Sequence, residues 1–302
     1  MPDPRAAVMV RNLDRAGNYK GFALDDADDA EPEEAEPIEL PVLEGAIPET
    51  RDGAASKVKL FRFAEAAGRP SIVPEGSLVL DEPALIGTGP DTQPVRYADR
   101  FPARPVGRLY CYRRNAAKYG TAWVIGPRHI LTAAHCVHRN GNGWIDRAIF
   151  RPDDGTAGAP ALPCTRIASP VGWSDGNPQD GPADFLYDFA VLELSTDVAA
   201  TFGTIGFRTA LSGNVCTALG FPERSPPSLL RCTGRIAPQG AFGKMRNDLD
   251  PGASGGPWLI WSGDAPIAIG ITSFRLKTDS KVAFSPPFGE VLANLIDWVD
   301  AH

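Results

Sequence analysis

Long apolar runs are missing from this chain of 302 residues, and no stretch approaches the roughly 20 apolar residues of a membrane-spanning helix. The sequence also lacks an HExxH run, a paired Cys-x-x-Cys spacing and a glycine-rich phosphate loop before a helix. The Asn-Gly repeat at 140–143 and the Asp-Asp-Gly run at 153–155 are interpreted as turns rather than as a calcium loop. We therefore expect no membrane span, no metal, no cofactor and no nucleic-acid partner.

A secretory signal is also missing from the beginning of the sequence. Such a signal needs an apolar stretch of about 7–15 residues behind a basic start. Here only residues 6–10 separate Arg5 from Arg11, and Asp3 precedes them. Two alternatives follow: the protein is not exported by this route and is cytoplasmic, or the sequence given lacks its leader.

Basic residues are absent from residues 21–50, which contain eleven acids. The formal net charge of the whole chain is -7, so removing this stretch leaves +4 for the rest. Residues 1–56 contain too little apolar surface to offset the entropy of ordering them, and we expect them to be mostly disordered. The alternation at 57–63 predicts a short strand with a bulge.

Glycine and proline are abundant, at 31 and 29 residues, and they separate short apolar runs, which predicts a turn-rich, all-β protein. Near the end of the chain, apolar residues at helical spacing predict a helix over 288–300. The strands are expected at 109–112, 122–125, 130–132, 148–150, 189–194, 215–219, 230–236, 258–261 and 267–274.

The cysteines number five, an odd count, so at least one has no partner within the chain. Cys216 and Cys232 flank a proline-rich connection between two expected strands, and we favour a disulfide bond there. Cys136 has two alternative partners, Cys111 and Cys164. The alternative is that all five are reduced and buried as small apolar residues.

Three short motifs bring together the residue types needed for nucleophilic catalysis. Ser254 lies in the glycine-rich run Asp-Pro-Gly-Ala-Ser-Gly-Gly-Pro at 250–257, and His135 lies in Thr-Ala-Ala-His-Cys at 132–136. A serine hydroxyl needs a neighbouring imidazole to take its proton, and the imidazole needs a carboxylate to orient it. Asp188, which precedes an apolar strand, is the candidate carboxylate, and Asp184 is its less favoured rival. His129 is expected in a turn and His138 at the surface.

These three motifs, in this order, resemble the catalytic signatures of trypsin-fold serine proteases. Three further segments resemble those of the bacterial glutamyl-endopeptidase-like branch of this family. They are Gly-Pro-Arg-His-Ile-Leu at 126–131, Gly-Phe-Pro at 220–222 and the lead-in at 84–89. The resemblance covers about residues 85–302. It implies two antiparallel β-barrels, over about 100–196 and 205–285, with the active site in the cleft between them. Residues 1–84 occupy the position of a propeptide.

The resemblance also assigns roles to single residues. It makes His135 the general base, Asp188 its orienting carboxylate and Ser254 the nucleophile, with the N–H groups of Gly252 and Ser254 as the oxyanion hole. The expected substrate-binding residues are Asp248, Thr272, Ser273, Phe274 and Arg275.

Two departures from the family pattern limit what the resemblance implies. Trypsin-like zymogens have an aspartate immediately before the serine, where this chain has Ala253, so activation through that ion pair is excluded. Glutamyl-specific members have a histidine at Thr272 and a hydroxyl at Leu249. Asp248 favours a basic substrate side chain, whereas Arg275 either neutralises Asp248 or attracts an acidic side chain. We favour the basic preference.

The sequence therefore predicts a serine endopeptidase that needs no cofactor and acts on protein or peptide substrates. The alternative is a catalytically silent homologue that binds protein segments. The acidic leader suggests two further alternatives: a mask that keeps the enzyme latent as a zymogen, or a solubilising tail. Members of the family are secreted, whereas this sequence shows no secretory signal, so a secreted and a cytoplasmic location both remain open. The sequence does not predict the oligomeric state.

Overall fold

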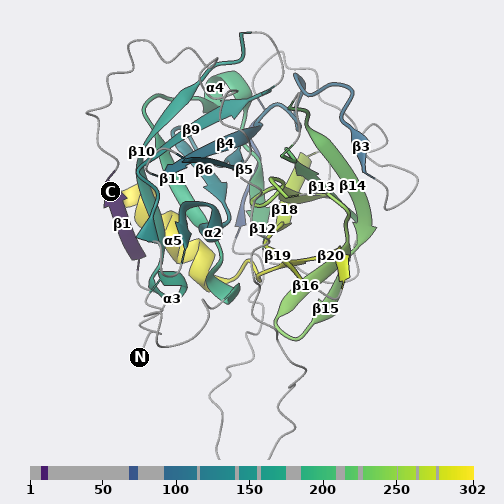
Figure 1. Cartoon of the computed structure of the whole chain (residues 1–302). Helices are drawn as coiled ribbons and strands as arrows, with labels where there is room; N and C mark the ends of the chain where they lie inside the picture. Colours follow the sequence, from purple (N-terminus) through teal and green to yellow (C-terminus); the bar gives the residue numbers. More distant parts are fainter. Residues whose placement is uncertain are drawn as a thin grey trace, which may run out of the picture.

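The computed structural model describes residues 8–12, 68–73, 92–113, 116–139, 143–154, 158–174, 185–208, 215–223, 227–249, 251–262, 265–276 and 279–302. The predicted strand at 57–63 and the rival carboxylate Asp184 lie outside these residues. No helix within them is both long enough and apolar enough to span a membrane. The predicted all-β fold with a C-terminal helix is confirmed (Figure 1).

The first half of the fold is a closed barrel of six antiparallel strands. Closure follows from the pairing of β10 with both β11 and β9, and it leaves no barrel edge unpaired. The interior is filled by fully buried apolar side chains, among them Leu109, Phe150 and Leu192. The strands follow each other around the barrel as β10 (Leu162–Pro170), β11 (Ala190–Leu194), β6 (His129–Thr132), β5 (Ala116–Val124), β4 (Val106–Arg113) and β9 (Arg147–Pro152).

The second half consists of two sheets rather than one closed ladder of hydrogen bonds. The larger has the order β2 (Gly68–Arg69), β12 (Gly206–Arg208), β18 (Ala265–Ile271), β17 (Pro257–Ser262), β13 (Val215–Gly220), β14 (Leu230–Arg235) and β3 (Gln93–Pro94). The smaller has the order β15 (Ala237–Gln239), β16 (Phe242–Arg246), β20 (Asp279–Ser285) and β19 (Phe274–Leu276). All pairs are antiparallel except β12 with β18.

The C-terminal helix α5 (Glu290–Ala301) confirms the helix expected from the spacing of apolar residues. It buries Leu292, Leu295, Ile296 and Val299, which lie on one face at intervals of three and four residues. These side chains belong to a core cluster that includes residues of both halves of the fold, and the helix itself packs against β10 and β11 of the barrel (Figure 1).

Two strands lie within the predicted leader and were not expected. β1 (Val8–Asn12) pairs with β10 of the barrel, and β2 pairs with β12 of the second half. In Figure 1, β1 lies beside the C-terminus of the chain.

Three longer strands were also missed. These are β10, β16 and β20, and their sequences mix prolines, charged residues and glycine with few apolar residues. Their pairing partners are distant in sequence, so no local pattern marks them.

The predicted disulfide bond between Cys216 and Cys232 is wrong, because none of the five cysteines forms a disulfide in the structure. Strand pairing places Cys216 opposite Gly234, and Cys232 opposite Ala218. The two thiols also have different neighbours. Cys216 Sγ lies 3.1 Å from Met245 Sδ, whereas Cys232 Sγ lies 3.6 Å from Asp248 Oδ1. The alternative of five reduced cysteines describes the structure.

Candidate active site

His135 and Asp188 form a close pair in the first barrel. His135 lies on the short helix α2 (Ala134–Val137), directly after β6, and Asp188 lies between the 3-10 turn η3 (Phe185–Tyr187) and β11. Because β6 and β11 are neighbours, the two residues meet at the same end of the sheet. His135 Nδ1 lies 2.8 Å from Asp188 Oδ2, and the His135 backbone N–H donates to Asp188 Oδ1 at 2.8 Å.

Asp188 is fully buried, and a third donor completes its shell. The hydroxyl of Ser273, from the second half, donates to Asp188 Oδ2. A buried carboxylate keeps its charge only when hydrogen bonds replace the lost water. Burial opposes the charged form of His135, but Asp188 and Cys136 together outweigh that effect and raise the pKa of His135 above its usual value.

Ser254 belongs to the second half but is tied to the His135 region by its own backbone. Its carbonyl accepts a hydrogen bond from the backbone N–H of Thr121 at 2.7 Å, and it lies 3.8 Å from the thiol of Cys136, the residue after His135. The next residue, Gly255, donates its N–H to Thr272 O at 2.8 Å, one residue before Ser273. The three motif residues are therefore brought to one place.

Thr121 is a buried polar residue that the sequence analysis did not identify. Besides the bond to Ser254, its hydroxyl donates to Gly252 O at 2.9 Å and accepts from the N–H of Phe221 at 2.9 Å. Its carbonyl accepts from the hydroxyl of Thr132 at 2.7 Å. Thr121 thus fastens the serine loop to the first barrel, and no local sequence signal marks it.

Two glycines beside Ser254 are required by the backbone. Gly252 and Gly255 have φ angles of 93° and 86°, in the left-handed region that other residues rarely adopt. A Cβ on Gly255 would overlap the carbonyl of Thr121 and the hydroxyl of Thr132. Any other residue at these positions would therefore move the serine loop.

Ala253 is fully buried in the apolar cluster that contains Trp258. Its Cβ also lies close to Gly220, where a second Cβ would not fit. The residue before the serine is therefore part of a hydrophobic core.

Of the expected substrate-binding residues, Phe274 and Arg275 lie on β19, Thr272 and Ser273 lie between β18 and β19, and Asp248 lies in the segment before Ser254. The carboxylate of Asp248 accepts from the hydroxyl of Thr92 at 2.7 Å, and the Thr272 hydroxyl accepts from Trp258 Nε1 at 3.0 Å. The guanidinium of Arg275 donates to the carbonyls of Asn247, of Leu249 at 2.6 Å and of Ser280 at 2.9 Å. Burial lowers the pKa of Arg275.

A row of aromatic rings connects the two halves beside His135. Its imidazole lies 6.5 Å from Trp173, which lies 5.5 Å from Phe185, which lies 4.6 Å from Phe274 (ring centroids). Phe274 was expected here, but Trp173 and Phe185 were not, since they are isolated aromatic residues outside any motif.

The other histidines near the motif differ from expectation. His138 is buried rather than at the surface, with its ring 4.8 Å from that of Trp144, and burial lowers its pKa. His129 begins strand β6 instead of lying in a turn. Asp154 lies in a turn, as expected, and its carboxylate accepts from the Tyr110 hydroxyl at 2.7 Å and lies 3.4 Å from Arg151 Nε.

The comparison with known families matches residues 120–269 to the trypsin-like peptidase domain. These residues include both parts of the site, from Thr121 to Ser254. The chain carries a trypsin-like peptidase domain. The resemblance seen in the motifs is thereby confirmed.

Two curated relatives share part of the sequence. A glutamyl endopeptidase of Bacillus licheniformis is 27% identical over 193 residues, which are 59% of this chain and 58% of the relative. An extracellular metalloprotease of Bacillus subtilis is 27% identical over 151 residues, 47% of this chain and 46% of that protein. The chain thus spans about half the length of these relatives.

Solved structures share the fold of the trypsin-like domain. The protease Anisep of Arthrobacter nicotinovorans superposes with a TM-score of 0.60 at 19% identity, covering 70% of this chain and all (100%) of that one. A Glu endopeptidase in complex with MPD gives a TM-score of 0.59 at 20% identity, and the match covers 72% of this chain and 100% of the endopeptidase chain.

Proposed function

We propose that this protein is a serine endopeptidase that hydrolyses peptide bonds through His135, Asp188 and Ser254. The observation that supports this most directly is the pairing of His135 Nδ1 with the fully buried Asp188, 2.8 Å apart. That contact fixes the imidazole so that Nε2 is the nitrogen free to act on a serine hydroxyl.

The reaction is acyl transfer in two steps. His135 removes the proton from the Ser254 hydroxyl as its oxygen attacks the peptide carbonyl, and then gives that proton to the leaving amine. Water, deprotonated by His135, next attacks the acyl-enzyme and releases the second product. Asp188 stays ionised and stabilises the imidazolium that forms in each step.

The N–H groups of Gly252 and Ser254 form the oxyanion hole in this proposal. The positive φ of Gly252 and the bond from Thr121 to its carbonyl hold this peptide segment in one conformation. Pre-oriented donors stabilise the developing negative charge by about 3–4 kcal/mol each.

For specificity we propose a basic residue before the scissile bond, recognised by Asp248. Asp248 is half-buried and its oxygen accepts from neutral donors, the Thr92 hydroxyl and the Cys232 thiol. Arg275 instead braces the segment beside Asp248, through the carbonyls of Asn247 and Leu249.

A denatured peptide library tests both parts of the proposal. Wild type and Ser254→Ala are incubated with the library, and new termini are read by mass spectrometry. Cleavage by wild type alone, after Lys or Arg, is the expected result. Cleavage after Glu would assign specificity to Arg275 instead. Absence of cleavage by the full chain and by a chain beginning near Ile86 would favour the binding module.

A further inference from the structure

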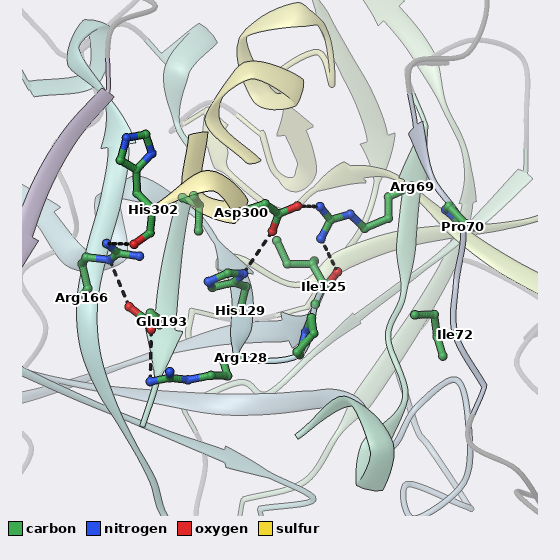
Figure 2. Close-up of a pocket in the computed structure, with 13 residues that line it drawn as sticks. Arg69, Pro70, Ile72, Ile125, Arg128, His129, Arg166, Glu193, Asp300 and His302 are labelled. Atoms are coloured by element: carbon green, nitrogen blue, oxygen red, sulfur yellow. Dashed lines mark hydrogen bonds and ion pairs between the residues drawn. The ribbon is translucent and has the colours of Figure 1, made fainter. Parts of the chain in front are cut away.

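A pocket of about 620 Å³ lies away from the catalytic residues and is lined by charged side chains. Figure 2 shows Arg69 on one side, Arg166 on the other, and Arg128 and His129 between them. His129 begins β6 and Glu193 lies on β11, directly opposite it. The pocket is thus at the other end of the two strands that lead to His135 and Asp188.

Three guanidinium groups line this pocket, those of Arg69, Arg128 and Arg166. They face two side-chain carboxylates, each of which is shared, and the main-chain oxygen of His302, which accepts from Arg166 at 3.2 Å (Figure 2). Glu193 lies 3.1 Å from both Arg128 and Arg166, while Asp300 contacts Arg69 and lies 3.4 Å from His129 Nδ1. Burial lowers the pKa of His129, so it adds no charge near neutral pH. The side chain of Arg128 is 41% exposed and open to a further anionic partner.

The two strands of the leader end at opposite sides of this pocket. β1 ends at Asn12, which pairs with Arg166, and β2 begins at Gly68, next to Arg69. In Figure 2 the ribbon of β1 passes on the side of Arg166, and Arg69 lies across the pocket. The chain between Asn12 and Gly68 therefore leaves one rim of the pocket and returns to the other.

Both anchors are specific. Arg69 donates to Ile125 O at 3.0 Å and pairs with Asp300, and the backbone of Ile72 exchanges hydrogen bonds of 3.0 and 2.8 Å with Thr204. A Cβ on Gly206 would overlap the backbone of Arg69, so the second half is shaped for this segment.

We propose that the acidic stretch at 25–49 binds this pocket through its carboxylates. The stretch lies between the two anchors and has eleven acids with no Lys or Arg, which complements the partly exposed guanidinium of Arg128. Tethering at both ends gives an effective concentration of about millimolar, enough to fill even a weak site. The leader then lies behind the catalytic residues and leaves the substrate side open, in contrast to a mask over the cleft.

Arginine modification tests the proposal on the full chain. The Ser254→Ala protein, which cannot cut its own leader, is treated with phenylglyoxal, and the modification rate of each arginine is read by peptide mass spectrometry. The comparison is the same chain with the eleven acids of 25–49 changed to Asn or Gln. We expect Arg128 to react about threefold or more slowly with the acids present, because a tethered segment occupies the pocket most of the time.

Three controls make the result decisive. Exposed Arg246, on β16, should react equally in both chains. Raising the salt from about 0.05 M to about 1 M should remove the protection of Arg128, because it shortens the Debye length to about 3 Å. Protection should be independent of protein concentration. Equal rates of Arg128 modification in the two chains would overturn the proposal, and so would protection that appears only at high concentration, which would assign the pocket to a second copy of the chain.

Discussion

The trypsin-like domain contains two histidine–aspartate pairs at opposite ends of strand β6. At one end, His135 Nδ1 lies 2.8 Å from Asp188. At the other, His129 Nδ1 lies 3.4 Å from Asp300. The residue types are the same, and the sequence separation of the two histidines is small, yet the pKa of His135 is raised and that of His129 is lowered.

Burial of the carboxylate explains the difference. Asp188 is 0% exposed and accepts hydrogen bonds from the His135 backbone, the His135 ring and Ser273. Asp300 is 39% exposed and is shared with Arg69. Water and a competing cation weaken an exposed pair, whereas a buried, hydrogen-bonded carboxylate attracts an imidazolium strongly. Proximity of histidine and aspartate therefore does not by itself raise the pKa of the histidine.

The largest effect expected at the His135 end comes from the nucleophile. Ser254→Ala should lower the rate of peptide hydrolysis by about a millionfold, because it removes the hydroxyl that attacks the peptide carbonyl in the proposed reaction. Ser195→Ala, an exposed serine that follows β11 at the His129 end, is the matched control and should leave the rate unchanged. Thermal unfolding of both variants should match wild type. A Ser254→Ala protein that retains activity would remove this site from the chemistry.

Replacing the two carboxylates one at a time tests the difference between the two histidine–aspartate pairs directly. Asp188→Asn should lower kcat by about ten-thousandfold, because an amide favours the wrong imidazole tautomer. Asp300→Asn should change kcat less than twofold and stability by about 0–1 kcal/mol, as expected for an exposed pair. Steady-state kinetics on one peptide substrate give both values. Similar losses in the two variants would contradict the assigned difference.

The pH dependence should separate the two histidines. His135 must be neutral to act as a base, so kcat/KM should fall about tenfold per pH unit below its pKa, which lies above the usual value of about 6.5. The His135–Asp188 pair should stabilise the fold at low pH, and this contribution should be lost as pH rises through the raised pKa. NMR titration of the imidazole protons should place His129 below 6.5, and Asp188→Asn should lower the pKa of His135 alone.

A smaller effect than that of Asp188→Asn is expected from the third hydrogen bond to Asp188. Ser273→Ala removes one donor to a charged group and should lower kcat about tenfold, which corresponds to about 1.4 kcal/mol. The accompanying readout is the pKa of His135: with one donor fewer, the Asp188 charge is less stabilised, and the pKa measured by NMR should rise further. An unchanged rate and an unchanged pKa would show that two donors suffice.

Much of the site was predictable because its chemistry depends on local motifs. A serine with glycines on both sides, a histidine after a β-strand and an aspartate before one are each visible in a few residues. The supporting residues were not. Thr121 fastens the serine loop, Trp173 and Phe185 line the aromatic row, and strand β10 closes the barrel. Each acts through a partner distant in sequence, so its own neighbours carry no signal.

The sequence by itself determined the all-β class, the C-terminal helix, the three motif residues and the separation of acidic leader from basic body, because these follow from short-range patterns and composition. Only the tertiary structure decided that the cysteines form no disulfide and that His138 is buried. It also decided that β1 and β2, the strands on either side of the acidic stretch, lie beside an arginine-lined pocket. Strand register and burial set these outcomes. Both depend on contacts between segments that are far apart along the chain. These contacts determine how deeply each side chain is buried, and burial in turn affects its charge and its hydrogen-bond partners.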